Sequence, residues 1–167
     1  MPVSPAAVKE LRELTGAGML DCKSALEEAG GDFDKAKDIL RKKGIAMAAK
    51  KAQRATAEGL VQTYIHHDGR LGALVEINCE TDFVARTDDF SKLAQNIALQ
   101  VAATNPTYVA SEDLPEDTEG NAKELCLLLQ PFVRDESTTV DEMVKETIRK
   151  VGENIRIRRF ARFELGR

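Results

Sequence analysis

The segment Thr81-Asp82-Phe83-Val84 brings a hydroxyl, a carboxylate and an aromatic ring together at one junction. Alternating apolar residues over 71–79 predict a β-strand before it, and apolar residues at helical spacing over 90–101 predict a helix after it. An acid and an aromatic ring at such a junction are either buried or directed at a partner. Phenylalanine suits a partner contact because it offers a large apolar area. The exposure of Asp82 and Phe83 therefore decides much of what the chain does.

The residues that most often serve catalysis do not form a site. Cys79 continues the apolar face of its strand, where a buried thiol is usually inert, and His66 and His67 are adjacent on a strand and face opposite sides. Cys22, Cys79 and Cys126 lie far apart without a CxxC pair, which argues against zinc and disulfides. The chain also lacks the P-loop, GxGxxG, GxSxG and HExxH motifs. We therefore expect a binding protein with no catalytic group, cofactor or metal of its own.

Composition sets the broad class. The chain has 167 residues, of which 43% are hydrophobic and 31% charged, as in ordinary globular domains. The net charge of −4 argues against direct binding of nucleic acid. No signal peptide or membrane-spanning run is evident, so we expect no membrane association. A reducing cytosol fits the isolated cysteines, and a mature organellar chain would also lack a transit peptide.

Residues 1–44 are expected to form three short helices, each ended by glycine, the last at Gly44. A bundle of this size is marginal alone, which favours a compact partner-binding module. The loop after Gly16 presents Met19 and Leu20 at the start of the second helix. At this stage the two side chains suit a core and a docking surface equally well.

The rest of the chain is predicted to be an α+β domain. Residues 45–57 form a basic linker, and 58–167 form a small antiparallel sheet packed with helices. A hairpin over 58–79 precedes a long helix that ends before Pro106. Residues 111–121 are acidic and indicate an exposed loop. Thr139-x-x-Glu142 is a capping box before the last helix.

The final strand, 154–165, alternates between apolar residues and arginines. The alternation predicts a buried face made of Ile155, Ile157, Ala161, Phe163 and Leu165. The opposite face would be a solvent face made of Arg156, Arg158 and Arg162.

Three segments resemble the elongation factor Ts family: Leu11–Leu26, Val75–Ala85 and Gly152–Arg159. They are long, specific and in the family's order. The resemblance implies a three-helix ubiquitin-associated-like module, a linker and an α+β core. It also implies a guanine nucleotide exchange factor that binds the GDP form of the GTPase elongation factor Tu and expels GDP. The resemblance places the chain in the bacterial cytoplasm, with the plastid stroma or mitochondrial matrix as the alternative for a mature chain.

The resemblance further implies residue roles. Asp82 and Phe83 would enter the GTPase near its magnesium ion, with the ring acting as a wedge. The remaining residues implied in contact with elongation factor Tu are Lys9, Arg12, Met19, Leu20, Asp21, Cys22, Lys23, Lys51, Thr81 and Val84.

The chain departs from the family pattern in length. Longer members have a second core subdomain, which is missing here, and short members dimerise in its place, so the resemblance allows a homodimer. Two other interpretations stay open. One is a module that binds a ubiquitin-like or other protein without exchange activity. The other is an RNA-binding protein that uses Tyr64 and the arginines of the last strand, Arg156, Arg158, Arg159 and Arg162.

Overall fold

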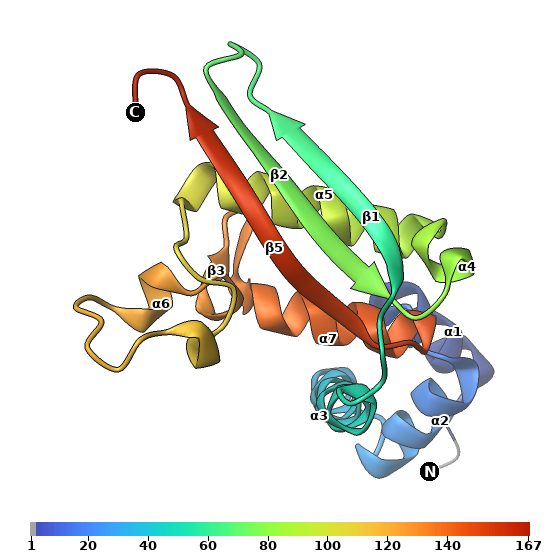
Figure 1. The fold of residues 1–167 in the computed structure, drawn as a ribbon. Coiled ribbons are helices and arrows are strands. Elements are labelled where there is room, and N and C mark those ends of the chain that lie inside the picture. The colour runs from blue at the N-terminus through green and yellow to red at the C-terminus, as the bar shows by residue number, and fades with distance from the viewer. Residues whose placement is uncertain (1–2) are drawn as a thin grey trace.

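Three antiparallel strands form the sheet on which the molecule is assembled (Figure 1). The computed structural model describes residues 3–167. In spatial order the strands are β1 (Glu58–Ile65), β2 (Leu71–Cys79) and β5 (Ile155–Glu164). Helices α5 (Asp88–Thr104) and α7 (Val140–Val151) pack against one face of this sheet. The predicted α+β class is confirmed.

The acidic lobe between α5 and α7 contains only short elements. They are the 3₁₀ turns Ser111–Asp113 and Leu127–Leu129, helix α6 (Ala122–Leu125), and strands β3 (Pro131–Phe132) and β4 (Asp135–Thr139). The predicted capping box is present, since Thr139 and Glu142 exchange hydrogen bonds at the start of α7.

The N-terminal module consists of α1 (Pro5–Thr15), α2 (Met19–Glu28) and α3 (Phe33–Lys51). The prediction that the third helix ends at Gly44 is wrong, because α3 continues to Lys51 and takes in half of the expected linker. Gly44 is buried, and a Cβ atom there would lie 3.3 Å from Cδ of Arg149. This glycine thus allows α3 and α7 to approach closely.

A β-bulge in the last strand changes which side chains face the core. Glu76 pairs with Arg159 and Ile77 with Ile157, so Arg158 is the extra residue. Beyond a bulge the alternation of faces is reversed. The predicted solvent position of Arg162 is therefore wrong: its side chain is 16% exposed, and Nε donates to the carbonyl oxygen of Ala102 in α5 at 2.9 Å.

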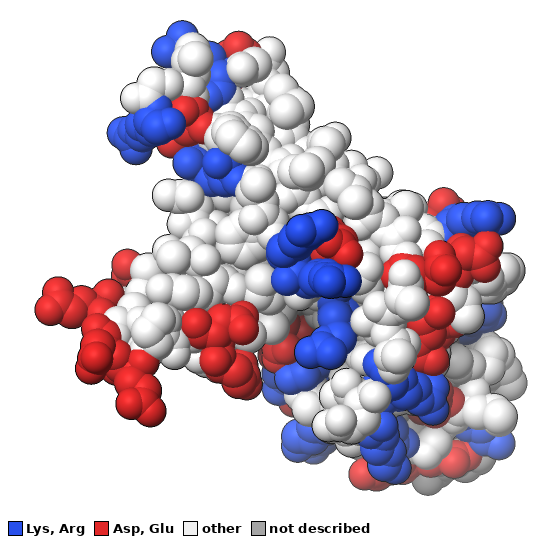
Figure 2. All heavy atoms as spheres, in the orientation of Figure 1, with Lys and Arg blue, Asp and Glu red and all other residues white. Residues whose placement is uncertain are grey.

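The same reversal leaves apolar side chains on the open face of the sheet. Phe163 is 75% exposed, so the prediction that it is buried is also wrong, as it is for exposed Ala161 and Leu165. The open face presents a set of exposed apolar residues from all three strands: Val61, Ile65, Leu74 and Phe163. Figure 2 shows this face, where a largely uncharged surface covers the sheet between clusters of charged residues.

Candidate functional site

The candidate site is the turn that follows β2, residues 81–84, here called the wedge turn. Thr81 caps helix α4 (Asp82–Ala85), because its Oγ1 accepts a hydrogen bond from the amide of Val84 at 3.4 Å. The helix is one turn long, and Phe83 projects from it with 77% of its surface exposed. This excludes the interpretation of Phe83 as a core residue.

Buried residues anchor the wedge turn to the hydrophobic core. Cys79 and Ala85 are buried on either side of it, and so is Val84, which is 4% exposed. The side chain of Val84 anchors the turn, whereas those of Thr81, Asp82 and Phe83 are exposed to solvent. The partner contact predicted for Val84 remains a prediction.

Asp82 forms an ion pair with Arg86 one helical turn away, at 2.9 Å. Both side chains are more than half exposed, 64% for Asp82 and 79% for Arg86. Such a surface pair contributes little to stability. Asp82 is therefore able to exchange Arg86 for a charged group of a partner at low cost.

Glu153, in the loop between α7 and β5, fixes the backbone of the wedge turn. One carboxylate oxygen accepts the amides of Glu80 and Thr81 at 3.1 and 3.0 Å. The other accepts the hydroxyl of Thr81 at 2.6 Å. Sequence analysis missed Glu153 because it lies 72 positions from Thr81 and no local spacing signals the contact.

The same loop ties the wedge turn to the end of the linker. Glu80 accepts the backbone amide of Asn154 at 2.7 Å, and it pairs with Arg54 at 3.6 Å. Asn154 in turn donates to the carbonyl oxygen of Arg54 at 2.8 Å. The wedge turn is thus part of a connected polar network rather than an isolated loop.

A second exposed surface lies at the start of α2 in the N-terminal module. Leu20 is 83% exposed and Met19 48%, which decides in favour of a surface position for both. Gly16, with φ of 64°, and buried Ala17 shape the loop that presents them. The remaining exposed residues predicted here are Lys9, Arg12, Asp21 and Lys23.

Two predicted contact residues of this region have internal positions. Cys22 is fully buried in the core of the module, so its side chain is not exposed to a partner, and its predicted contact remains a prediction. Lys51 is half-buried and donates to the carbonyl oxygen of Gly152 at the end of α7. That contact gives Lys51 a role in joining α3 to the α7–β5 loop.

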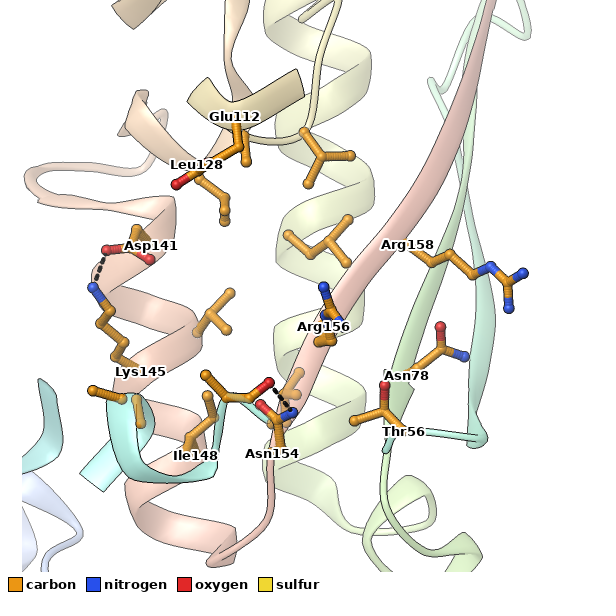
Figure 3. Close-up of a pocket in the computed structure, with 18 of the residues that line it drawn as sticks. Thr56, Asn78, Glu112, Leu128, Asp141, Lys145, Ile148, Asn154, Arg156 and Arg158 are labelled. Carbon is orange, nitrogen blue, oxygen red and sulfur yellow. Dashed lines mark hydrogen bonds and ion pairs between the residues drawn. The ribbon is translucent and has the colours of Figure 1, made fainter. Parts of the chain in front are cut away.

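A groove of about 850 Å³ lies between α3, α7 and β5. Figure 3 shows its mixed lining, with Asn154 and Ile148 at one end and the Asp141–Lys145 pair on α7. It contains no histidine or cysteine among its lining residues. Across residues 3–167, no three His, Cys, Asp or Glu side chains are grouped to hold a metal ion.

The cysteine nearest the wedge turn is unsuited to nucleophilic chemistry. Burial raises the pKa of Cys79 to about 11, and the carboxylate of Glu153 adds to the effect. A thiol with such a pKa is protonated at neutral pH, and the protonated form is a poor nucleophile. Sγ instead donates a hydrogen bond to the carbonyl oxygen of Thr81 at 3.1 Å.

Arg158 and Arg159 of the last strand share one acidic partner. Both pair with Glu76, at 3.8 and 2.7 Å, and both side chains remain more than two-thirds exposed. Figure 2 shows acidic residues gathered on the lobe that contains α6. Within residues 3–167, no helix has both the length and the apolar character needed to cross a membrane.

Comparison with known proteins points to one family. The family model described as Elongation factor TS matches residues 23–120. The chain is 51% identical to Elongation factor Ts of Carboxydothermus hydrogenoformans, with 98% of this chain and 89% of that protein covered. It is 47% identical to Elongation factor Ts of Fervidobacterium nodosum, over 99% of this chain and all of that protein. For the protein of the same name in Rippkaea orientalis, identity is 50%, over 98% of this chain and 78% of that protein.

Proposed function

Because the chain belongs to the elongation factor Ts family, and so acts in translation elongation, we propose that it is a guanine nucleotide exchange factor for the GTPase elongation factor Tu. It would bind the GDP form of the GTPase and promote GDP release. Since the relatives named above are bacterial, we place this step in the bacterial cytoplasm.

The observation that supports this proposal most is the exposure of Phe83 on a fixed turn. A phenylalanine that is 77% exposed loses the benefit of burial in the free protein. It regains that benefit when it enters an apolar pocket of a partner. The capped turn and its polar network direct the ring before the partner arrives, which lowers the entropic cost of binding.

The mechanism requires no bond to be made or broken. Asp82 and Phe83 would insert beside the magnesium ion of the GTPase and stabilise its nucleotide-free state over its GDP-bound state. Displacement of the magnesium ion removes a divalent charge from the diphosphate, which speeds GDP release. The protein is thus not an enzyme in the usual sense, and its action is a difference between two binding free energies.

The N-terminal module would supply affinity through a second contact. Leu20 and Met19 give it an apolar centre, and the charged residues around them, Lys9, Arg12, Asp21 and Lys23, form a polar rim. Binding at two linked surfaces raises the effective concentration of each. This division assigns affinity to the module and nucleotide release to the wedge turn.

The decisive experiment measures release of a fluorescent GDP analogue from elongation factor Tu, with catalytic amounts of wild-type or Phe83→Ala protein. Wild type should accelerate release, and Phe83→Ala should slow it about tenfold, which corresponds to about 1.4 kcal/mol of coupling. Asp82→Ala should have a smaller effect. Binding of wild type without any acceleration would instead support a binding module without exchange activity.

We also propose that the protein forms a homodimer through the open face of its sheet. The exposed apolar residues on that face, Val61, Ile65, Leu74 and Phe163, come from all three strands. A second copy would bury the same residues on both sides, as a two-fold interface requires. Light scattering during gel filtration should give the mass of a dimer, and Phe163→Asp should give a monomer. A monomeric wild type at high concentration would contradict this proposal.

A further inference from the structure

Glu153 makes three contacts to one short stretch of backbone. Its carboxylate accepts the amides of Glu80 and Thr81 and the hydroxyl of Thr81, all at 2.6–3.1 Å. A carboxylate that accepts several hydrogen bonds from neighbouring residues fixes their backbone more firmly than one contact does. These contacts join two segments that are more than 70 positions apart in the sequence.

The backbone needs this support because regular pairing stops just before it. The ladder of β2 ends at Cys79, which pairs with Glu58 and Ile155. The next two amides, those of Glu80 and Thr81, therefore have no strand partner, and helix α4 begins only at Asp82. Glu153 satisfies both amides at the point where the chain changes from strand to helix.

The contact also reaches the helix that bears the wedge. Thr81 donates its hydroxyl proton to Glu153, and the same oxygen accepts the amide of Val84 at 3.4 Å. The carboxylate thus orients the hydroxyl that caps α4. Since α4 is a single turn, the direction of its first residues sets the direction of Phe83.

The place of Glu153 in its own loop suits this role. It follows Gly152, which ends α7 in the left-handed conformation with φ of 77°. It precedes Asn154, whose side chain donates to the carbonyl oxygen of Arg54 at the end of the linker. The backbone at Glu153 is thus fixed on both sides, by the end of a helix and by a buried asparagine.

We propose that Glu153 is a positioning residue for nucleotide exchange: it touches neither partner nor nucleotide, and it fixes the direction in which Phe83 enters the GTPase. The proposal rests on the proposed exchange function. Without Glu153 the ring would still be present and exposed, but the wedge turn would sample several directions. Exchange would then slow because the productive direction is only one of these.

The test compares Glu153→Ala with Glu142→Ala, a matched control. Glu142 likewise accepts the amide and the hydroxyl of a threonine, Thr139, but at the opposite end of α7. Both variants lose a carboxylate that fixes a threonine, and Glu142→Ala also loses the ion pair with Arg41 of α3 at 2.7 Å, so it should lose at least as much stability as Glu153→Ala. Only Glu153→Ala should lower the maximal rate of GDP release, by about tenfold, with little change in the concentration for half-maximal effect. Glu153→Gln, which keeps one accepting oxygen, should lie between Glu153→Ala and wild type.

A second readout does not depend on exchange. The chain has no tryptophan, so Phe83→Trp gives a single fluorescent reporter on the wedge turn. In that background Glu153→Ala should add a fast component to the anisotropy decay, and hydrogen exchange at the amides of Glu80 and Thr81 should become about tenfold faster. Thr81→Val, which loses the hydroxyl and keeps the two amide contacts, should reproduce the effect on anisotropy, whereas Thr81→Ser should behave as wild type.

The outcomes separate the two proposals. If wild type does not accelerate GDP release, the proposed function fails, and the anisotropy and hydrogen exchange still decide whether Glu153 orders the turn. If the anisotropy decay and the rate of GDP release are unchanged in both Glu153→Ala and Thr81→Val, the positioning role is overturned. If Glu142→Ala slows GDP release as much as Glu153→Ala does, the positioning role is overturned as well, because the effect would then reflect stability alone.

Discussion

The guanidinium of Arg149 donates a hydrogen bond from Nη2 to the carbonyl oxygen of Thr15 at 2.8 Å, and so joins the last turn of α7 to the end of α1. The side chain is 5% exposed and also pairs with Glu146. Four positions later in the chain, Glu153 holds the wedge turn. One end of α7 therefore fixes both surfaces that we propose to meet the GTPase.

Arg149→Met should weaken the contact between the N-terminal module and α7. Methionine keeps much of the apolar volume but cannot satisfy the carbonyl oxygen of Thr15. We expect a loss of about 2 kcal/mol in the free energy of unfolding, measured in urea. The affinity for elongation factor Tu should fall while the maximal rate of GDP release stays close to wild type. Arg156→Met, at an exposed position, is the control, and equal stability of the two variants would contradict the prediction.

Gly59 should not tolerate a side chain. Its φ is +149°, and a Cβ atom would lie 2.1 Å from the carbonyl oxygen of Ile77 in the neighbouring strand. Because that atom belongs to backbone, Gly59→Ala should destabilise the sheet by about 3 kcal/mol or prevent folding. Gly69→Ala separates the steric clash from the strain of a positive φ, since Gly69 has φ of +68° with no atom within 4 Å of the added Cβ. It should cost only about 1 kcal/mol, and similar melting temperatures for both variants would refute the steric argument.

Leu20→Ser should affect binding and not folding. Leu20 is 83% exposed, so its replacement should change the free energy of unfolding by less than about 0.5 kcal/mol. The dissociation constant for elongation factor Tu should rise at least about fivefold, measured by calorimetry. Leu14→Ser is the control on the same module: Leu14 is 61% exposed but lines the groove toward α7. A similar loss of affinity in Leu14→Ser would show that the effect is not specific to the α2 surface.

The parts of the fold that were predictable from sequence have local causes. Capping residues mark the ends of helices, as at Thr139 and Gly152, and alternation marks the strands of the hairpin. The bulge at Arg158 has a signal in the sequence that the predicted alternation passed over. Arg158 and Arg159 stand in tandem, and Phe160 then falls in phase with the arginines although it packs against the core. The bulge reverses the faces of Arg162 and Phe163.

The candidate site was predictable in part. The junction of strand and helix placed the wedge turn, but only the structure decides that Phe83 is exposed and Val84 buried. Glycine at a helical position usually indicates an end, and Gly44 instead serves the contact with Arg149, which depends on tertiary packing. The roles of Glu153 and Arg149 likewise arise from contacts over long sequence separations.

The capping box of α7 should make stability depend on pH in the acid range. The pKa of Glu142 is lowered from its ordinary 4.5, chiefly because its carboxylate accepts the amide of Thr139, with a further contribution from Arg41. A lowered pKa in the folded state means that the contribution is present above pH 4.5 and is lost as the pH falls below it. Glu142→Gln should remove about 1 kcal/mol at pH 7 and flatten the dependence below pH 4.5. Urea unfolding at several pH values measures the loss at pH 7 and the pH dependence. If the free energy of unfolding of the variant falls with pH as steeply as that of wild type, the assignment to Glu142 is contradicted.

The three thiols should be protected in the native protein. Cys22, Cys79 and Cys126 are all free and buried. Burial also raises the pKa of Cys79 to about 11 and that of Cys126 above its ordinary value, so both are protonated at pH 8. We expect Ellman's reagent to react at pH 8 at the rate of global unfolding, and with all three thiols at once in denaturant. Ser24→Cys, at an exposed position on α2, should add one thiol that reacts immediately. Rapid reaction of any thiol in the native wild type would show that the region around it opens locally. Variants that each keep one of the three cysteines would identify the thiol that reacts.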